Sequence, residues 1–210
     1  MLDIYAIVKV GKTKRKIKAN SFVKNFLTAL YGSLIEQYIS LVDVNGNTIS
    51  NTGIIGTWSD WCNSYMAPGG CRGGTARVST NAGRLLLNAP EGDDTYGIVV
   101  GTGTTPVTPD DYKLEQQIPH GSSDNQLYHY PCNVLDLEVE GNRVIQKIQR
   151  QFENRGTVDI DINEIGLQAL VIDSGGTTYK VLIVRDVLSE PISIPSGGTA
   201  VLEVWLVTEV

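Results

Sequence analysis

The strongest constraint on the fold is a succession of short, β-prone apolar runs separated by glycine-rich turns. These runs occupy residues 3–10, 84–88, 96–101, 131–154, 157–173, 177–187 and 199–210. One of them places Val158, Ile160 and Ile162 on one face and polar residues on the other, which is the period of a half-buried strand. The chain has 22 glycines to supply turns, well above the usual share of roughly 7%. The pattern predicts a mainly β fold, an antiparallel β-sandwich of jelly-roll-like kind.

One segment has the period of a helix. In "NSFVKNFLTALYGSLIEQY" apolar side chains recur three and four residues apart, and Ser21 is suited to cap the first turn. The apolar set is Phe22, Val23, Phe26, Leu27, Leu30, Leu34 and Ile35. We predict one N-terminal amphipathic helix over residues 21–36 that packs on the sandwich, followed by a hairpin about Asn45-Gly46.

Residues 51–83 follow neither period. Large apolar side chains stand there among Gly, Ser, Asn and Thr, namely Trp58, Trp61, Tyr65 and Met66. A long irregular segment in a compact domain is usually functional or disordered, and exposed apolar groups mark contact surfaces. We predict that these four residues form an interface. The segment would join a strand, helix and hairpin unit (1–50) to the sandwich (84–210) within one structural domain.

The charge is unevenly distributed along the chain. Residues 1–18 carry six Lys or Arg against one acid, a net +5, which leaves −11 for the rest of a chain whose net charge is −6. The basic run includes Lys14, Arg15 and Lys16. It is either a solvated hairpin or an arm that contacts nucleic acid or an acidic partner. The acidic remainder argues against a dedicated nucleic-acid binder.

Neither a secretory signal nor a membrane span is expected. The N-terminus has no basic leader and its apolar run is broken, and no stretch of about 18 apolar residues occurs. The odd count of three cysteines suggests synthesis in a reducing compartment, although a Cys62–Cys71 disulfide stays open.

Motifs that resemble catalytic ones lack the residues that their chemistry needs. Gly101-Thr102-Gly103 has no lysine before Lys113, and Pro106 and Pro109 prevent a helix from following, so a phosphate cradle is not expected. Asp173-Ser174-Gly175 resembles one half of an aspartic protease site, but turn chemistry alone explains it. His120, His129 and the cysteines make no complete zinc motif. We expect no enzymatic activity, no catalytic residue, no cofactor and no metal.

The Gly-Thr-Gly segment is therefore interpreted as the exit from a buried strand. The following residues, "TPVTPDDYKLEQQI", would form a strap along the sandwich, with Leu114 and Ile118 on a single turn that presses on it. The acidic pairs Asp93-Asp94 and Asp110-Asp111 would be solvated turns.

Several short motifs in a fixed order resemble a class of uncharacterised virion structural proteins of tailed phages and related viruses. The motifs are Gly101-Thr102-Gly103, Asp111 to Leu114, Asn154 and Gly156, Glu164 to Leu167, Arg185-Asp186, and Pro191 to Thr199. The resemblance covers about half the chain and excludes residues 51–83. It implies a β-sandwich at a vertex, tail or fibre, present in many copies as a homo-oligomer in contact with other virion proteins. Such a protein is made in the host cytoplasm and resides in the virion, and the class has no catalytic residues to transfer.

A different class of function stays open from the same residues. Trp58, Trp61 and Tyr65 would suit the stacking surface of a carbohydrate- or host-receptor-binding module. Assembly state separates the two hypotheses, because a lone binding module stays monomeric.

Overall fold

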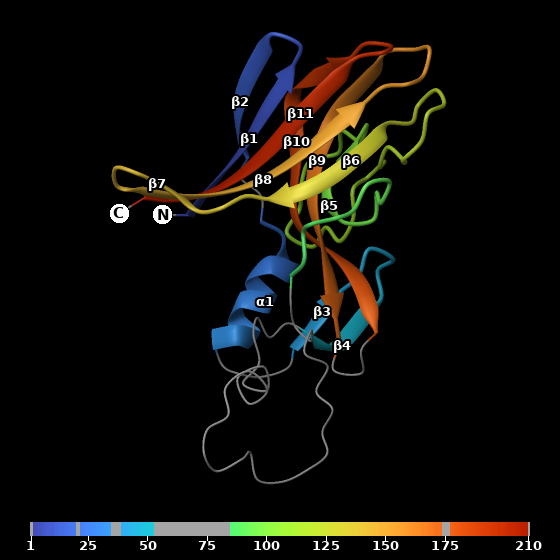
Figure 1. Ribbon diagram of the computed structural model, residues 1–210. Helices are drawn as coiled ribbons and strands as arrows, with labels where there is room; N and C mark the ends of the chain where they lie inside the picture. Colours follow the sequence, from blue (N-terminus) through green and yellow to red (C-terminus); the bar gives the residue numbers. More distant parts are fainter. Residues whose placement is uncertain (1, 20–21, 35–38, 53–84, 174–176, 210) are drawn as a thin grey trace, which may run out of the picture.

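A computed structural model describes residues 2–19, 22–34, 39–52, 85–173 and 177–209 (Figure 1). Over these residues the protein is mainly β, its sheets are antiparallel, and it contains one helix. The mainly β prediction is therefore confirmed.

The larger sheet has six strands in the order β2-β1-β11-β8-β6, and β7 pairs with β8 beyond the end of β6. Each pairing is antiparallel, and β11 runs beside β8 from Thr199↔Glu153 to Glu209↔Arg143. The strands are β1 (Leu2–Val10), β2 (Thr13–Ala19), β6 (Tyr128–Val134), β7 (Glu138–Glu140), β8 (Arg143–Glu153) and β11 (Thr199–Glu209).

A second sheet has three strands in the order β10-β9-β5, and a small hairpin pairs β3 with β4. The long β9–β10 hairpin spans the turn at Asp173, as the sequence predicts, and β5 is buried along its whole length. These strands are β3 (Ile39–Val42), β4 (Thr48–Thr52), β5 (Gly97–Gly101), β9 (Ile160–Ile172) and β10 (Thr178–Ile194).

The two larger sheets share one hydrophobic core. Alternate side chains of the six-stranded sheet, such as Ile4, Ile148 and Leu202, belong to the same buried cluster as Ile98 and Leu167 of the other sheet. The opposite side of the six-stranded sheet is called its outer face below. It carries Tyr5, Lys16 and Trp205, because side chains alternate along each strand.

Helix α1 (Lys24–Leu34) packs on β10 and β3. It begins three residues later than predicted because Phe22 forms a bridge with Val184 and the Val23 N–H donates to the Ile183 carbonyl (3.1 Å). Its buried Asn25 donates to the carbonyls of Val42 (2.8 Å) and Leu182 (3.2 Å). The helix is thereby fixed between β3 and β10.

The predicted apolar face of this helix is only partly buried. Val23 and Ala29 are buried, but Leu27 and Leu30 are 59% and 39% exposed, and Tyr31 beside them is 57% exposed. The side chains of Ser21, Leu34 and Ile35 lie outside the described residues.

Three other local expectations need correction. Residues 85–88 form no strand, since Leu86 makes a single bridge with Leu170. The strand expected from residue 131 to the turn at Gly141 is divided into β6 and β7. Val158 precedes β9 and is 44% exposed, whereas Ile160 and Ile162 are buried as predicted.

Candidate functional site

The Gly-Thr-Gly segment leaves β5 and holds a carboxylate of the protein itself. The backbone N–H groups of Gly103 (3.2 Å), Glu115 (3.1 Å) and Gln116 (2.8 Å) all donate to the buried Glu164 side chain. A Cβ on Gly103 would lie 2.5 Å from a Glu164 oxygen, so glycine is required for this close approach. Glu164 therefore takes the position that a phosphate would need, and the segment is the strand exit that the sequence predicts.

Arg185 continues this cluster across β10. Its guanidinium donates to Glu164 (2.9 Å), to Asp111 (2.7 Å) and to the Thr105 carbonyl (3.1 Å). Burial alone would raise the pKa of the Asp111 carboxyl, but hydrogen bonds from Arg185 and Thr108 outweigh burial and lower that pKa. Asp111 is thus an ion-pair partner, and the expectation that it is a solvated turn residue was wrong.

The strap, residues 105–118, is attached to the second sheet by this cluster. Leu114 and Ile118 are each 3% exposed, so both press on the body as predicted. They do not share a helical turn, however. The strap returns beside β5 through a Gly101↔Gln117 bridge, and the Ile118 N–H donates to the Val100 carbonyl (2.9 Å). The ion pairs of the cluster therefore hold the strap against the second sheet.

Arg150 on β8 links the six-stranded sheet to β5 and to the residues that precede β5. The fully buried guanidinium donates to the carbonyls of Tyr130 (2.9 Å), Ile98 (3.0 Å) and Tyr96 (3.1 Å), and also to that of Asp93. Burial lowers its pKa. With its donors bound to backbone, Arg150 has a structural role.

His129 and Cys132, the strongest zinc candidates, do not converge on a shared site. Neither ring nitrogen of the buried His129 has a hydrogen-bond partner among the described residues, and the Cys132 sulfur accepts from the Ile98 N–H (3.4 Å). Burial, with smaller effects of Arg150 and His120, lowers the pKa of His129 to about 3. Over the described ranges no three His, Cys, Asp or Glu side chains are grouped to hold a metal ion.

The other candidate motifs lie in turns. Asp173 accepts from the Thr177 N–H (2.8 Å), and Asp43 accepts from the N–H groups of Asn45 (2.9 Å) and Asn47 (2.8 Å). Gly46 has φ +84°, which lets the β3–β4 hairpin close. Asp94 accepts from the His120 N–H (2.7 Å).

The predicted interface residues are only partly described. Trp58, Trp61, Tyr65 and Met66 lie outside the described residues, as do Cys62 and Cys71. Lys14, Arg15 and Lys16 are on β2, but alternation along the strand puts Arg15 on the side opposite to the two lysines.

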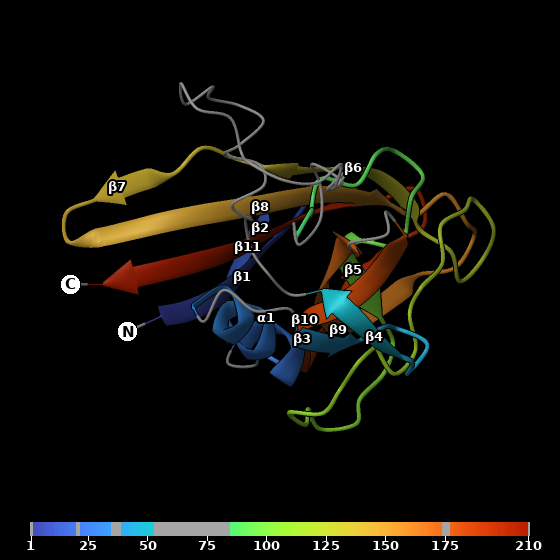
Figure 2. The same ribbon diagram turned by 90° about the horizontal axis from the view of Figure 1, so that it is seen from below.

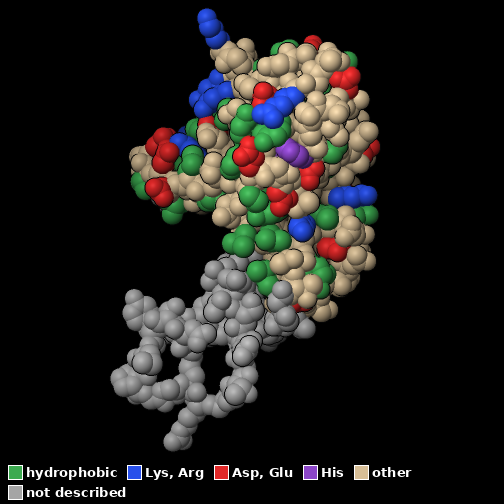
Figure 3. All heavy atoms as spheres, turned by 45° about the vertical axis from the view of Figure 1, so that its right-hand side comes forward, with side chains coloured by type: hydrophobic (Ala, Val, Ile, Leu, Met, Phe, Trp, Pro, Cys, Tyr) green, Lys and Arg blue, Asp and Glu red, His purple; other side chains and the backbone are tan. Residues whose placement is uncertain are grey.

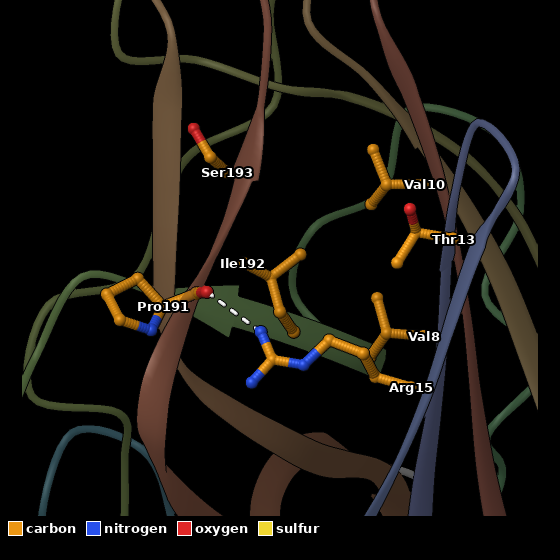
Figure 4. A pocket seen from close by; sticks show the side chains of 7 residues that line it. All are labelled: Val8, Val10, Thr13, Arg15, Pro191, Ile192 and Ser193. Atoms are coloured by element: carbon orange, nitrogen blue, oxygen red, sulfur yellow. Dashed lines mark hydrogen bonds between the residues drawn. The ribbon is translucent and has the colours of Figure 1, made fainter.

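Arg15 tethers the β1–β2 hairpin to β10. It donates to Glu190 (2.7 Å) and to the Pro191 carbonyl (3.2 Å), crossing a shallow cavity of about 200 Å³ that Val8, Val10 and Ile192 also line (Figure 4). Arg15 therefore contacts β10, whereas Lys14 and Lys16 lie on the other face of β2, and an interface role for the three residues stays a prediction.

On the outer face, lysines cover aromatic rings. Lys16 Nζ lies 4.0 Å from the centroid of Tyr5, and Lys147 Nζ lies 4.6 Å from that of Trp205. The buried Glu203 carboxylate accepts from Lys9 (2.6 Å) and from the Trp205 indole N–H (2.9 Å). Ion pairs and cation–π contacts thus organise this face.

Sequence reasoning missed a projection of the larger sheet. The β7–β8 turn and the adjoining end of β11 extend past the second sheet (Figures 1 and 2). We call residues 134–144 the arm. Its exposed apolar side chains are Val134 (47%), Leu135 (36%), Leu137 (65%), Val139 (73%) and Val144 (39%). Val139 pairs with Val144, and both side chains lie on the face of the sheet that packs into the core elsewhere. The arm therefore extends this apolar face beyond the part that the second sheet covers.

Comparison with known proteins adds no assignment: no protein family, no curated protein and no solved structure matches this chain. Among the described residues, no helix has both the length and the apolar character to cross a membrane.

Proposed function

We propose that this chain is a non-enzymatic structural protein of a virus particle, which self-assembles in many copies and contacts other virion proteins. The observation that carries the proposal is the arm. Leu137 and Val139 are 65% and 73% exposed on a strand extension that no described segment covers. A contiguous exposed apolar surface on a soluble protein marks a contact site, because leaving it in water costs free energy.

The residues of the motifs that resemble those of virion structural proteins stabilise the fold of this chain, which supports the proposal. Gly103, Asp111, Glu164 and Arg185 meet in the cluster that attaches the strap. Asn154 donates to the carbonyls of Val158 (2.8 Å) and Ile194 (2.9 Å). Residues that bind one another in this way help to specify the fold.

We further propose that the two larger sheets form a β-sandwich of jelly-roll-like kind, with α1 packed on it. Their shared core and antiparallel pairing support this arrangement. A sandwich would provide the rigid body from which the arm projects, and the strap would brace its smaller sheet.

The test compares the purified full chain with a variant that carries Leu137→Asn and Val139→Asn. Light scattering should give a multiple of the subunit mass for the natural chain and a reduced mass for the variant, with unchanged circular dichroism. Val158→Asn is the matched control, since Val158 is exposed but lies outside the arm. If the arm variant assembles as well as the natural chain, the arm is not part of the interface. In particles from infected cells, antibody labelling should detect the protein, and its absence there would refute the virion role.

A further inference from the structure

The six-stranded sheet has two open edges of opposite charge. At one end no described strand pairs with the outer side of β2, and residues 12–18, here called the basic edge, carry five Lys or Arg and no acid. At the other end residues 133–140, here called the acidic edge, carry three acids and no Lys or Arg. In Figure 3 basic side chains gather at the upper left, above a projecting lobe where acidic and hydrophobic side chains gather.

The acidic edge begins where described backbone no longer forms hydrogen bonds with the free side of β6. Along β6 the Gly92 N–H donates to the His129 carbonyl (3.0 Å) and the Cys132 N–H donates to the Ala89 carbonyl (2.8 Å). Beyond Cys132 no described backbone pairs with the free side of residues 133–140. An uncovered edge presents unpaired N–H and C=O groups that favour strand addition.

Both edges place their charges on the same face of the sheet. Lys14 and Lys16 lie opposite Lys9 and Ile7 on the outer face, and Glu138 lies there too, because it binds Lys147 beside Trp205. Glu140, two residues on, has the same orientation. If the sheet continued from one copy into the next, these lysines and glutamates would stand side by side as cross-strand pairs of opposite charge.

Several of these charges have no ion-pair partner within the described part of the chain. Lys14, Lys16 and Glu140 are exposed and form no salt bridge there, and the same holds for Asp136. Contact between two basic edges or two acidic edges would bring like charges together. Only a basic edge against an acidic edge is attractive, so the charges select a head-to-tail contact over a two-fold one.

We propose that copies of this chain associate head to tail, with the basic edge of one subunit bound to the acidic edge of the next. The proposal rests on the self-assembly proposed above and names its contact surfaces. A head-to-tail contact leaves one edge free at each end, so further copies add until a ring closes or a filament grows. Four of the exposed apolar side chains of the arm lie within the acidic edge and would be buried in the same contact, namely Val134, Leu135, Leu137 and Val139.

The test is a charge exchange between two variants of the full chain. The first carries Lys14→Glu and Lys16→Glu, and the second carries Asp136→Lys and Glu140→Lys. In each variant like charges meet at the exchanged positions, so the concentration for half-assembly should rise by at least about tenfold. An equimolar mixture should recover assembly, because opposite charges then meet again at the exchanged positions.

The matched control for the first variant carries Lys24→Glu and Lys113→Glu, which changes the net charge by the same amount on exposed residues away from both edges. It should assemble as the natural chain does, and all variants should keep the natural circular dichroism. Light scattering measures assembly in low salt, and added salt should weaken it.

Failure of this inference is distinguishable from failure of the proposed function. If the natural chain assembles and each charge variant assembles equally well, or if mixing restores nothing, the edge contact is wrong while self-assembly stands. If the natural chain stays monomeric, self-assembly itself is wrong. The natural chain could instead bind a DNA oligonucleotide while the first variant does not, with assembly unchanged. That result would assign the basic edge to nucleic acid and overturn the proposal.

Discussion

Replacing His129 by leucine should stabilise the protein, increasingly so as the pH falls. The ring is fully buried, packs edge-on against Phe152 at 4.9 Å between centroids, and has two nitrogens without a described partner. Leucine is close to histidine in volume and has no polar atom to bury. At pH 7 the gain should be about 1 kcal/mol, the low end of the cost of an unsatisfied buried polar group.

The pH dependence follows from the lowered pKa. Burial holds the pKa of His129 at about 3 in the folded protein, while the unfolded chain has its ordinary value near 6.5. The unfolded state therefore binds an extra proton between pH 6.5 and 3, so His129 makes the folded state progressively less stable as the pH falls through that window. At about 1.4 kcal/mol per pH unit, the advantage of leucine should grow by roughly 3 kcal/mol between pH 6.5 and pH 4.

Urea unfolding of both proteins at pH 7, 6, 5 and 4 measures this difference directly. Other titrating groups act alike in both proteins and cancel. Phe152→Leu is the control: it alters the same packing without a titrating group, so its cost should be nearly constant with pH. If the difference between the natural chain and His129→Leu does not change across this range, the buried neutral histidine is refuted.

Four further substitutions test the structural roles assigned above. Gly103→Ala should destabilise by about 2 kcal/mol or more in urea unfolding, because its Cβ would meet Glu115 and Glu164 at 2.5 Å; a neutral result would contradict the close approach. Arg185→Leu should cost about 3–5 kcal/mol, since it leaves Glu164 buried without its cation; a cost below 1 kcal/mol would make the cluster dispensable. Burial raises the pKa of Asp186 to about 6, so the folded state loses stability as pH rises from about 4 to 6, and Asp186→Asn should gain about 1–2 kcal/mol at pH 7 but nothing at pH 3. Asp173→Asn keeps a turn acceptor and should change stability by no more than about 1 kcal/mol; loss of a proteolytic activity toward unfolded polypeptide in this variant would instead make Asp173 catalytic.

Local periodicity predicted most of the strands and the helix, because burial on one face leaves a regular trace in sequence. β1, β9, β10 and β11 each alternate or run apolar, and the turns at Gly46 and Gly141 have the positive φ that glycine permits. The arm was missed because Leu137 and Val139 have the same alternation as a buried strand. Their exposure depends on where the second sheet ends, which is a property of the whole fold.

The charged cluster could have been suspected but not assembled from sequence. Glu164 and Arg185 each interrupt an apolar run, and Arg150 takes the core-facing position between Ile148 and Phe152. A charge at such a position must be paired when buried. Their partners come from other elements: Arg150 binds backbone carbonyls, and Arg185 binds Asp111 at a separation of 74 residues. Periodicity carries no information on such distant pairs.

Self-assembly is tested by the mass of the protein in solution. The chain has a mass of 22.8 kDa, and light scattering on the purified full-length protein over a range of concentrations reports how many copies associate. We predict a multiple of this mass, which Leu137→Asn with Val139→Asn reduces toward one copy. A mass of one copy at every concentration, for the natural chain under low salt, would contradict self-assembly through the arm and the edges of the sheet.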